Sequence, residues 1–252
     1  MVVKKVSLNI VMSKFKFTYQ ELGVQLEKAK SNDYDFIRCV DYYNAKVKSI
    51  ELKKNTVVFR VDIDFSLAKT SHLLDLFREL GIKASFYLRL HAPEYNPFSF
   101  ENYLIVKRII NEGHELGYHS EVVDQAAIWS ENEVDCLKRD IEVIKSMFGH
   151  DIEGIASHGG MTGLNNLDFW KDREAQDFKL KYEAYENTSS FDLFSQSFYV
   201  SDSEWTRWKC YNKGELVNND NRTFGDHLDD KHSLIYLLIH PDTYYKRHFY
   251  EH

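Results

Sequence analysis

The sequence predicts an α/β fold built on a parallel sheet, either closed as a barrel or doubly wound. Short apolar, β-branched stretches alternate with longer amphipathic stretches, and Gly81 and Gly113 end two of the amphipathic ones. Helices that recur between buried strands are typical of both architectures. Only three prolines are present, and no repeat or low-complexity tract marks a linker. We therefore expect one domain over residues 1–252, with residues 1–55 packed onto the sheet.

The first predicted helix covers residues 18–30, because Thr18 is a good N-cap and Glu21 follows three residues later. Residues 56–63 (TVVFRVDI) are β-branched and short enough to form a buried strand. Stretches with helix-like and strand-like hydrophobic periods continue to alternate to the end of the chain. Further helices are predicted over residues 66–80, 100–112 and 130–148, and further strands over residues 84–90, 115–119, 154–157 and 233–239.

Composition and charge exclude several classes of partner. The net charge of -7 is spread along the chain, and no stripe of lysine and arginine could neutralise a phosphate backbone, so we expect no nucleic-acid partner. The apolar run within residues 1–13 is interrupted by Ser7 and Asn9 and lacks a small-residue cleavage site. No stretch is long enough to span a bilayer.

The three cysteines, Cys39, Cys136 and Cys210, are odd in number and far apart, without the spacing of a metal motif. We therefore expect reduced, mostly buried thiols. Together with the absence of a signal peptide or membrane span, this predicts a cytoplasmic protein. The oligomeric state is left open.

Polar side chains occupy the carboxyl ends of four predicted strands. They are Asp62 with Asp64, His119, the pair Ser157-His158, and His240. Functional groups of parallel α/β folds gather at this edge of the sheet, so we expect these residues to form one site.

Asp62 and Asp64 are two residues apart on a strand and should point to the same face. Two neighbouring carboxylates repel each other unless a cation lies between them. A divalent metal on one, with the other as a general base, resolves that conflict. The alternative is that Asp64 only caps the following helix. Arg60 either pairs with Asp62 or faces away from Asp64 beneath the sheet.

Two histidines of the segment GHELGYH (113–119) are given different roles. His119 ends the predicted strand, where a site residue is expected. His114 begins the strand and is more consistent with a buried, hydrogen-bonded structural residue. The flanking glycines leave the backbone free to turn sharply.

The segment FRVDIDFSLAKTSHLLDLFRELGIKASFYLRL, followed by NEGHELGYHSEVVD, resembles the catalytic core of the polysaccharide deacetylase (NodB-homology) family. Shorter segments from residue 17 onward resemble a branch found in surface-polysaccharide clusters, among them Tyr95-Asn-Pro-Phe-Ser99, Ser157-His-Gly-Gly160, Tyr199-Val-Ser-Asp-Ser203 and Leu238-Ile-His-Pro241. The resemblance implies a distorted (β/α)7-type barrel and a metal-dependent hydrolase that removes an N-acyl group, in most cases acetyl, from an amino sugar.

The resemblance also implies roles for individual residues. Asp62 would be the general base, Asp64 and His119 would bind the metal, and His240 would be the general acid. Three departures matter: Val61 and Val123 stand where the family has histidines, and Ser157-His-Gly-Gly160 replaces its Arg-x-Pro motif.

A third metal ligand is therefore missing from its usual place, although a hydrolytic zinc needs about three protein ligands. His158 is our first choice, Asp124 the second and Glu121 the third. His158 could instead lie behind the ligands or bind substrate. We expect one divalent metal, with zinc first, although iron, cobalt and nickel suit the same ligands.

The substrate is expected to be an acylated amino sugar of surface-polysaccharide or O-antigen synthesis, either free, nucleotide-linked or lipid-linked. Substrate contacts are assigned to Tyr95, Asn96, Asp202 and Trp208, with Asp202 as an alternative partner of a site histidine. Two other functions are weighed: a non-catalytic carbohydrate-binding or assembly protein on a degenerate deacetylase fold, and a metal-free glycosidase. The second fits poorly, because two carboxylates on one strand cannot flank a glycosidic bond.

Overall fold

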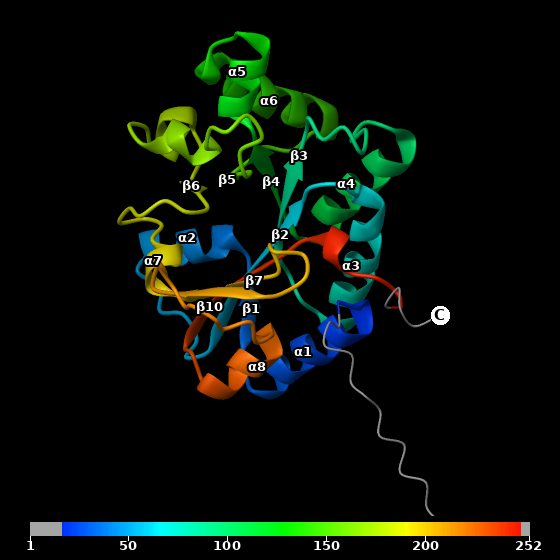
Figure 1. Cartoon of the computed structure of the whole chain (residues 1–252), viewed down its shortest axis with the longest axis vertical. Helices are drawn as coiled ribbons and strands as arrows, with labels where there is room; N and C mark the ends of the chain where they lie inside the picture. Colours follow the sequence, from blue (N-terminus) through cyan, green and yellow to red (C-terminus); the bar gives the residue numbers. More distant parts are fainter. Residues whose placement is uncertain (1–16, 248–252) are drawn as a thin grey trace, which may run out of the picture.

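The computed structural model describes residues 17–247. Helices and strands alternate along the chain as the sequence predicts (Figure 1). The strands are β1 (Asp35–Ile37), β2 (Thr56–Ile63), β3 (Ser85–Arg89), β4 (Glu115–Ser120), β5 (Gly154–Ser157), β6 (Tyr182–Glu183), β7 (Phe198–Ser201), β8 (Lys209–Asn212), β9 (Glu215–Leu216) and β10 (Leu234–Ile239). The α-helices are α1 (Tyr19–Ser31), α2 (Cys39–Val47), α3 (Leu67–Leu80), α4 (Phe100–Asn111), α5 (Val122–Trp129), α6 (Glu133–Phe148), α7 (Leu193–Gln196) and α8 (Phe224–His227). Short 3-10 helices are η1 (Asn166–Trp170), η2 (Ala175–Phe178), η3 (Leu228–Asp230) and η4 (Pro241–Thr243).

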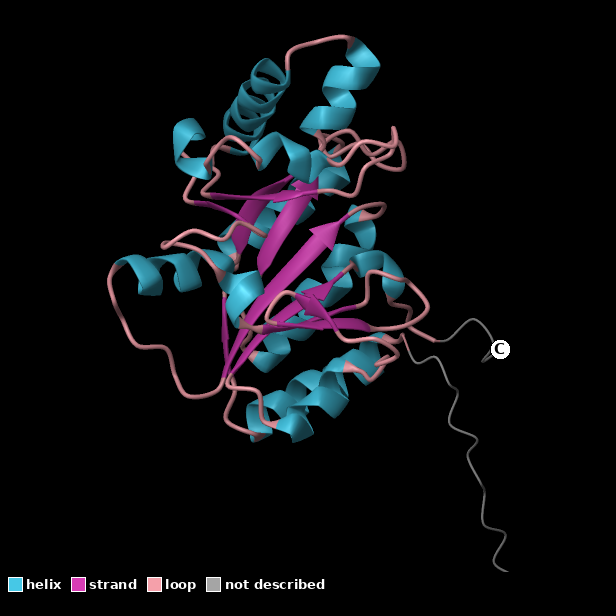
Figure 2. Ribbon diagram, turned by 60° about the vertical axis from the view of Figure 1, so that its left-hand side comes forward, coloured by secondary structure: helices cyan, strands magenta, loops and turns pink. Residues whose placement is uncertain are grey.

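All strands belong to one sheet, in the order β6-β5-β4-β3-β2-β10-β7-β8-β9, with β1 also paired to β2. Every pairing from β6 to β7 is parallel, whereas β8 and β9 are antiparallel. The sheet curves strongly but stays open between its edge strands β6 and β9 (Figure 2). This confirms a distorted, parallel-dominated barrel.

The helix signals of the sequence are confirmed at both ends of the main helices. The Thr18 side chain accepts the Glu21 N–H at 3.1 Å and begins α1. Ser66 accepts the Lys69 N–H and begins α3, which ends at Gly81 in the left-handed conformation (φ 66°). These residues satisfy backbone groups that a helix terminus leaves unpaired.

The helix predicted over residues 130–148 is confirmed as α6, which begins three residues later at Glu133. Asn132 caps α6 through the Val134 and Asp135 N–H groups. Helix α5, which precedes it, was not predicted; it ends at Trp129, and its C-cap Ser130 adopts a left-handed conformation (φ 57°). Helix α2 and the short strands β1, β6, β7, β8 and β9 were not predicted. These strands have two to four residues and are too short to show a hydrophobic period.

The two faces of the curved sheet bury different side chains. The outer face packs aliphatic residues and phenylalanines against α1, α3, α4 and α6. The inner face is rich in buried tyrosines, including Tyr87, Tyr182 and Tyr236. Gly117 makes this packing possible, because a Cβ there would lie 2.5 Å from the Tyr87 ring.

Helix α2 lies against the inner layer, and its first N–H groups are bound by buried side chains. Glu115 Oε2 accepts the Val40 N–H at 3.0 Å, and Ser85 Oγ accepts the Cys39 N–H at 2.7 Å. The Tyr182 hydroxyl also donates to Glu115. These buried polar groups thus hold α2 at the amino ends of the strands, opposite to the carboxyl ends of β2 and β4.

The N-terminal part of the described chain packs onto the sheet through several elements. Helix α1 contacts α3 and α8, and Thr18 bridges to Tyr245. Residues 1–13, with the interrupted apolar run, lie outside the described residues. Within residues 17–247, every helix is too short or too polar to cross a bilayer. The three cysteines are free and buried, as predicted.

We predict that His114 makes stability depend on pH. Its Nδ1 accepts the Ala84 N–H at 3.2 Å, and burial together with Lys83 lowers its pKa to about 4. The unfolded chain therefore binds a proton more readily, so stability falls as pH drops from about 6.5 towards 4. Relative to a His114→Gln variant, the wild type should lose about 2 kcal/mol between pH 7 and pH 5 in urea unfolding. A constant difference between the two proteins over this range would refute the assignment.

Candidate metal and catalytic site

The strand-end residues named by the sequence do meet in one pocket. Asp62 and Asp64 end β2, His119 lies near the end of β4, His158 follows β5 and His240 follows β10. They line a pocket of about 330 Å³, to which Phe65, Tyr185, Tyr199 and Trp205, among others, also contribute. The parallel order of β5, β4, β3, β2 and β10 brings these ends to one edge.

Asp62 forms a buried ion pair with Arg60. The Arg60 guanidinium donates to both oxygens of Asp62, at 2.7 Å and 2.6 Å, and both side chains are buried. The alternative in which Arg60 faces away from Asp64 is wrong. Residues 60, 62 and 64 are each two apart in an extended segment, so their side chains point to the same face. Against the cost of burial, Arg60 and His119 hold the pKa of Asp62 below its usual value.

Asp64 does not cap a helix, because Ser66 performs that role for α3. Its Oδ1 lies 3.2 Å from His119 Nε2 and has no hydrogen bond, although it is buried. Its Oδ2 lies 3.8 Å from His240 Nε2. Burial acts to raise the pKa of Asp64, but the neighbouring histidines outweigh it and lower that pKa. Asp64 is therefore an ionised carboxylate without a strong partner.

His119 presents a free ring nitrogen to the two aspartates. Its Nδ1 lies 2.8 Å from the Ala156 carbonyl oxygen, which can only accept, so Nδ1 carries the proton. Nε2 then faces Asp64 and lies 3.4 Å from Asp62 Oδ2. Burial lowers the pKa of His119, but the charges of both aspartates outweigh it and raise that pKa.

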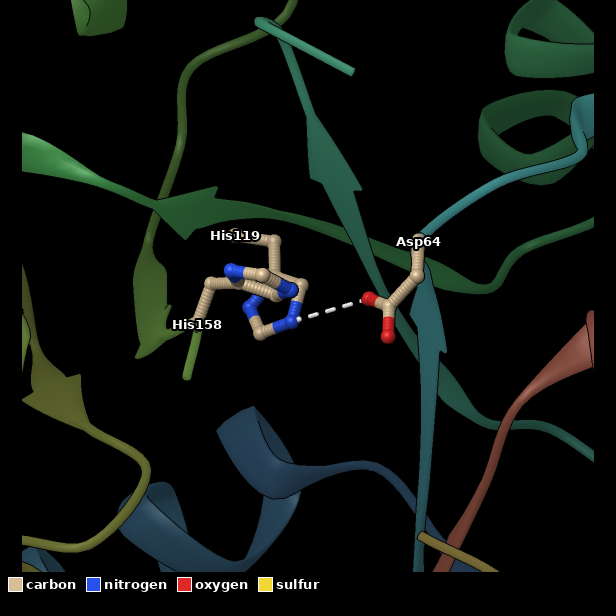
Figure 3. A group of neighbouring side chains, drawn as sticks. All are labelled: Asp64, His119 and His158. Atoms are coloured by element: carbon tan, nitrogen blue, oxygen red, sulfur yellow. Dashed lines mark ion pairs between the residues drawn. The ribbon is translucent and has the colours of Figure 1, made fainter. Parts of the chain in front are cut away.

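His158 completes a group of three possible ligands with Asp64 and His119 (Figure 3). One ligand atom from each residue lies within 4.8 Å of the others. The His158 ring stands nearly perpendicular to that of His119, with centroids 5.1 Å apart. Burial, together with His119, lowers the pKa of His158 to about 4, so the ring is neutral at pH 7.

Glu121, our third choice of ligand, lies behind His158. It forms a 2.8 Å ion pair with the buried Arg89, and its Oε1 lies 3.6 Å from His158 Nδ1. The carboxylate therefore supports the histidine and is not part of the ligand group found by geometry.

Asp124, the second choice of ligand, points elsewhere. Its carboxylate accepts hydrogen bonds from the Met161 and Thr162 N–H groups, the Thr162 hydroxyl and the Asn166 amide. It thus fixes the loop that follows His158, and Asn166 in turn donates to the His158 carbonyl. The Asp124 alternative is wrong because its lone pairs are used by this loop.

His240 is held by Asp202. Asp202 Oδ1 lies 2.6 Å from His240 Nδ1, and Oδ2 accepts the His240 N–H at 3.1 Å. Burial lowers the pKa of His240, but Asp202 and Asp64 outweigh it and raise that pKa to about 9. Of the two roles considered for Asp202, the structure shows the one that orients a histidine.

A model of the polysaccharide deacetylase family matches residues 49–175, which is half of the chain. The chain belongs to the polysaccharide deacetylase family. This membership confirms the class of carbohydrate deacetylase indicated by the sequence. Our comparison with curated proteins found no match.

Three solved structures show weak similarity to this family member. The deacetylase PplD of Streptococcus pyogenes, in complex with acetate, is 18% identical over 63% of this chain and 68% of that chain, with a TM-score of 0.46. A CE4 esterase of Streptococcus mutans is 16% identical over 80% and 78%, with a TM-score of 0.49. The chitin deacetylase of Colletotrichum lindemuthianum is 16% identical over 40% and 45%, with a TM-score of 0.32, so the chain spans less than half of that enzyme.

Three of the predicted substrate contacts of the deacetylase lie away from the pocket. The Tyr95 hydroxyl donates to the Ile63 and Arg89 carbonyls, and Asn96 accepts the Phe98 N–H within a turn. Trp208 is buried and stacks on Phe17 at 6.1 Å. Trp208 therefore has no open face for a sugar ring.

Trp205 is the aromatic residue that does border the pocket. It is 38% exposed, and its ring lies 5.3 Å from those of His240 and Phe65. It adopts a left-handed conformation (φ 60°), which follows the turn after Asp202. It was not among the predicted substrate contacts, because hydrophobic period does not distinguish an exposed tryptophan from a buried one.

We predict that Asp124→Ala loosens the loop after β5. Four donors would lose their acceptor, so the free energy of unfolding should fall by about 2 kcal/mol. Urea unfolding and limited proteolysis of the loop would measure the change. The control is Asp151→Ala, which removes an exposed ion pair with Lys145 and should cost less than about 0.5 kcal/mol. Equal effects of the two substitutions would contradict this role.

Proposed function

We propose that the protein is a metal-dependent hydrolase that removes an N-acyl group, normally acetyl, from an amino sugar of surface-polysaccharide or O-antigen synthesis. The observation that carries the proposal is the group Asp64, His119 and His158, with Asp62 and His240 beside it. The choice of sugar rests on the sequence resemblance, and the proposed cytoplasmic location rests on the three unpaired cysteines.

The three residues fit a divalent cation by their chemistry. Within the described residues, Asp64 Oδ1 is a buried atom without a hydrogen bond, and His119 Nε2 carries a free lone pair. His158 faces Glu121 through Nδ1, so its Nε2 is the nitrogen left for a cation. One carboxylate and two neutral imidazoles suit zinc, with iron, cobalt and nickel as alternatives. Such a cation supplies Lewis-acid polarisation of the acyl carbonyl and lowers the pKa of an attacking water.

Asp62 is assigned the role of general base. Arg60 keeps Asp62 ionised and fixes its orientation. Asp62 Oδ2 lies 3.4 Å from Nε2 of His119, which is one of the three candidate ligands. A carboxylate held in this way can accept a proton only from a strongly acidified water, which agrees with a neighbouring cation. The role therefore depends on the proposed metal.

His240 is assigned the role of general acid. Asp202 binds Nδ1, so Nε2 is the nitrogen that faces the pocket and Asp64. Its raised pKa keeps the ring protonated at neutral pH, ready to donate to a departing amine.

The region around Gly159 is assigned to the oxyanion of the reaction. The N–H groups of Ser157, His158 and Met161 already donate to Glu183, Ser120 and Asp124. Gly159 lines the pocket, and no side chain there hinders an approaching substrate. We assign the donor to the Gly159 backbone.

A metal-free glycosidase does not agree with this geometry. Asp62 and Asp64 come from the same strand, and Asp62 is occupied by Arg60, so the two carboxylates do not face each other across a bond. The alternative of a non-catalytic binding protein rests only on Val61 and Val123, which stand where the family has histidines. In the proposed site, His158 takes the place of the ligand that is missing at position 123.

We predict that Asp62→Asn lowers the rate of acetate release from N-acetylated sugar oligomers by about 10²–10⁴-fold, because the general base is lost. Acetate release by the zinc-loaded wild type and variant would be measured, with metal content and circular dichroism as controls. Chelation should abolish the activity of the wild type, and added zinc should restore it. An Asp62→Asn variant that turns over at the wild-type rate would overturn the mechanism.

Trp205 and Trp208 should respond differently to truncation. Trp205→Ala removes an exposed ring at the pocket and should raise KM by roughly 2–10-fold, with little loss of stability. Trp208→Ala leaves a cavity in the core and should cost about 3–5 kcal/mol of stability. Steady-state kinetics and urea unfolding would separate the two, and an unchanged KM for Trp205→Ala would exclude sugar stacking at this ring.

A further inference from the structure

A second group of metal-binding side chains lies away from the pocket. Cys210 on β8, Asp220 in the loop after β9 and His227 at the end of α8 each offer a ligand atom within 4.8 Å of the others. The His227 ring packs on Phe198 at 4.6 Å, and Phe198 begins β7, whereas the pocket lies at the opposite ends of the parallel strands. The two groups therefore share no residue.

His227 is arranged as a metal-binding histidine. It is fully buried, and its Nδ1 lies 3.4 Å from Asp230 Oδ2. Its Nε2 lies 3.7 Å from Asp220 Oδ1 and has no hydrogen bond within residues 17–247. A carboxylate on one ring nitrogen orients the imidazole and leaves the other nitrogen free for a cation. A buried nitrogen without any partner would otherwise be a cost to folding.

Cys210 adds a soft ligand to the group. Its thiol is free, 1% exposed and close to the Asp220 backbone. Thiolate, imidazole and carboxylate together suit zinc or cobalt better than calcium or magnesium. Asp220 also lines a cavity of about 230 Å³.

One cation, Arg222, already lies beside this group. It donates to both oxygens of Asp220, with the Oδ2 contact at 2.8 Å, and it pairs with Asp230 at 2.9 Å. A Cys210 thiolate and the two carboxylates carry three negative charges, and Arg222 cancels one of them. Two negative charges remain, which a divalent cation would neutralise.

We propose that Cys210, Asp220 and His227 form a structural site for a thiophilic divalent cation such as Zn²⁺. The cation joins β8, the loop after β9 and α8, which itself packs on α1. On binding, the Cys210 thiol releases its proton to solvent, and the fourth position is left to water. The site does not depend on the proposed function of the pocket.

Cobalt provides a direct test, because only a sulfur ligand gives a thiolate-to-Co²⁺ charge-transfer band. The full-length chain, freed of metal by a chelator, would be titrated with Co²⁺ in the Asp64→Ala background, which removes a ligand from the pocket. We expect the band to appear at about one equivalent and to disappear in Cys210→Ser. Cys136→Ser is the matched control, since Cys136 is also buried but lies on α6; it should keep the band.

Asp230→Asn provides a second, milder variant. It keeps all three ligands but weakens the support of His227, so Co²⁺ affinity should fall by about 10–100-fold while the band persists. Absence of the band from folded Asp64→Ala protein, or its persistence in Cys210→Ser, would overturn the proposal. Metal bound by Cys210→Ser would instead indicate the neighbouring group His227, Asp230 and His232.

Discussion

The site depends on how buried charges are paired at the carboxyl edge of the sheet. Three of the buried acids there have a cationic partner: Arg60 binds Asp62, Arg89 binds Glu121 and His240 binds Asp202. Asp64 is held less closely, because His119 Nε2 lies 3.2 Å from its Oδ1 and His240 Nε2 lies 3.8 Å from its Oδ2. An unpaired buried carboxylate is costly, and a cation at Asp64 removes that cost.

The parallel sheet creates this arrangement. Arg89 on β3 and His119 on β4 are register partners, and His119 is in turn the partner of Ala156 on β5, whose carbonyl fixes its tautomer. Strand β10 pairs with β2 up to Val61, so His240 emerges beside Asp62 and Asp64. Each strand therefore contributes a group at the same level, and backbone pairing, not loop conformation, sets the geometry of the ligands.

Much of this could be read from the sequence, because strand periodicity is strict. A short buried strand ending in Asp-x-Asp places both carboxylates on one face, and the same logic located His119, His158 and His240. It was harder to predict which side chains pair with one another, because pairing depends on the length and the direction of each side chain. Sequence spacing did not decide between the two roles of Arg60, nor show that the lone pairs of Asp124 are used by its own loop.

Burial of aromatic residues and long-range clusters were the least predictable features. Trp205 and Trp208 are three residues apart and chemically identical, yet one borders the pocket and the other packs on Phe17. Cys210, Asp220 and His227 have no motif-like spacing and meet only because β8 and α8 fold against β7. Such contacts follow from tertiary packing, which no local pattern encodes.

The central claim, that Asp64 requires a cation shared with His119 and His158, is tested most directly by the metal content of purified, zinc-reconstituted protein. Elemental analysis would compare the wild type with Asp64→Ala, His119→Ala and His158→Ala, using Asp124→Ala as the control. Each of the first three variants should hold about one equivalent fewer than the wild type, and Asp124→Ala should hold as many. Equal metal content in all five folded proteins would contradict the account.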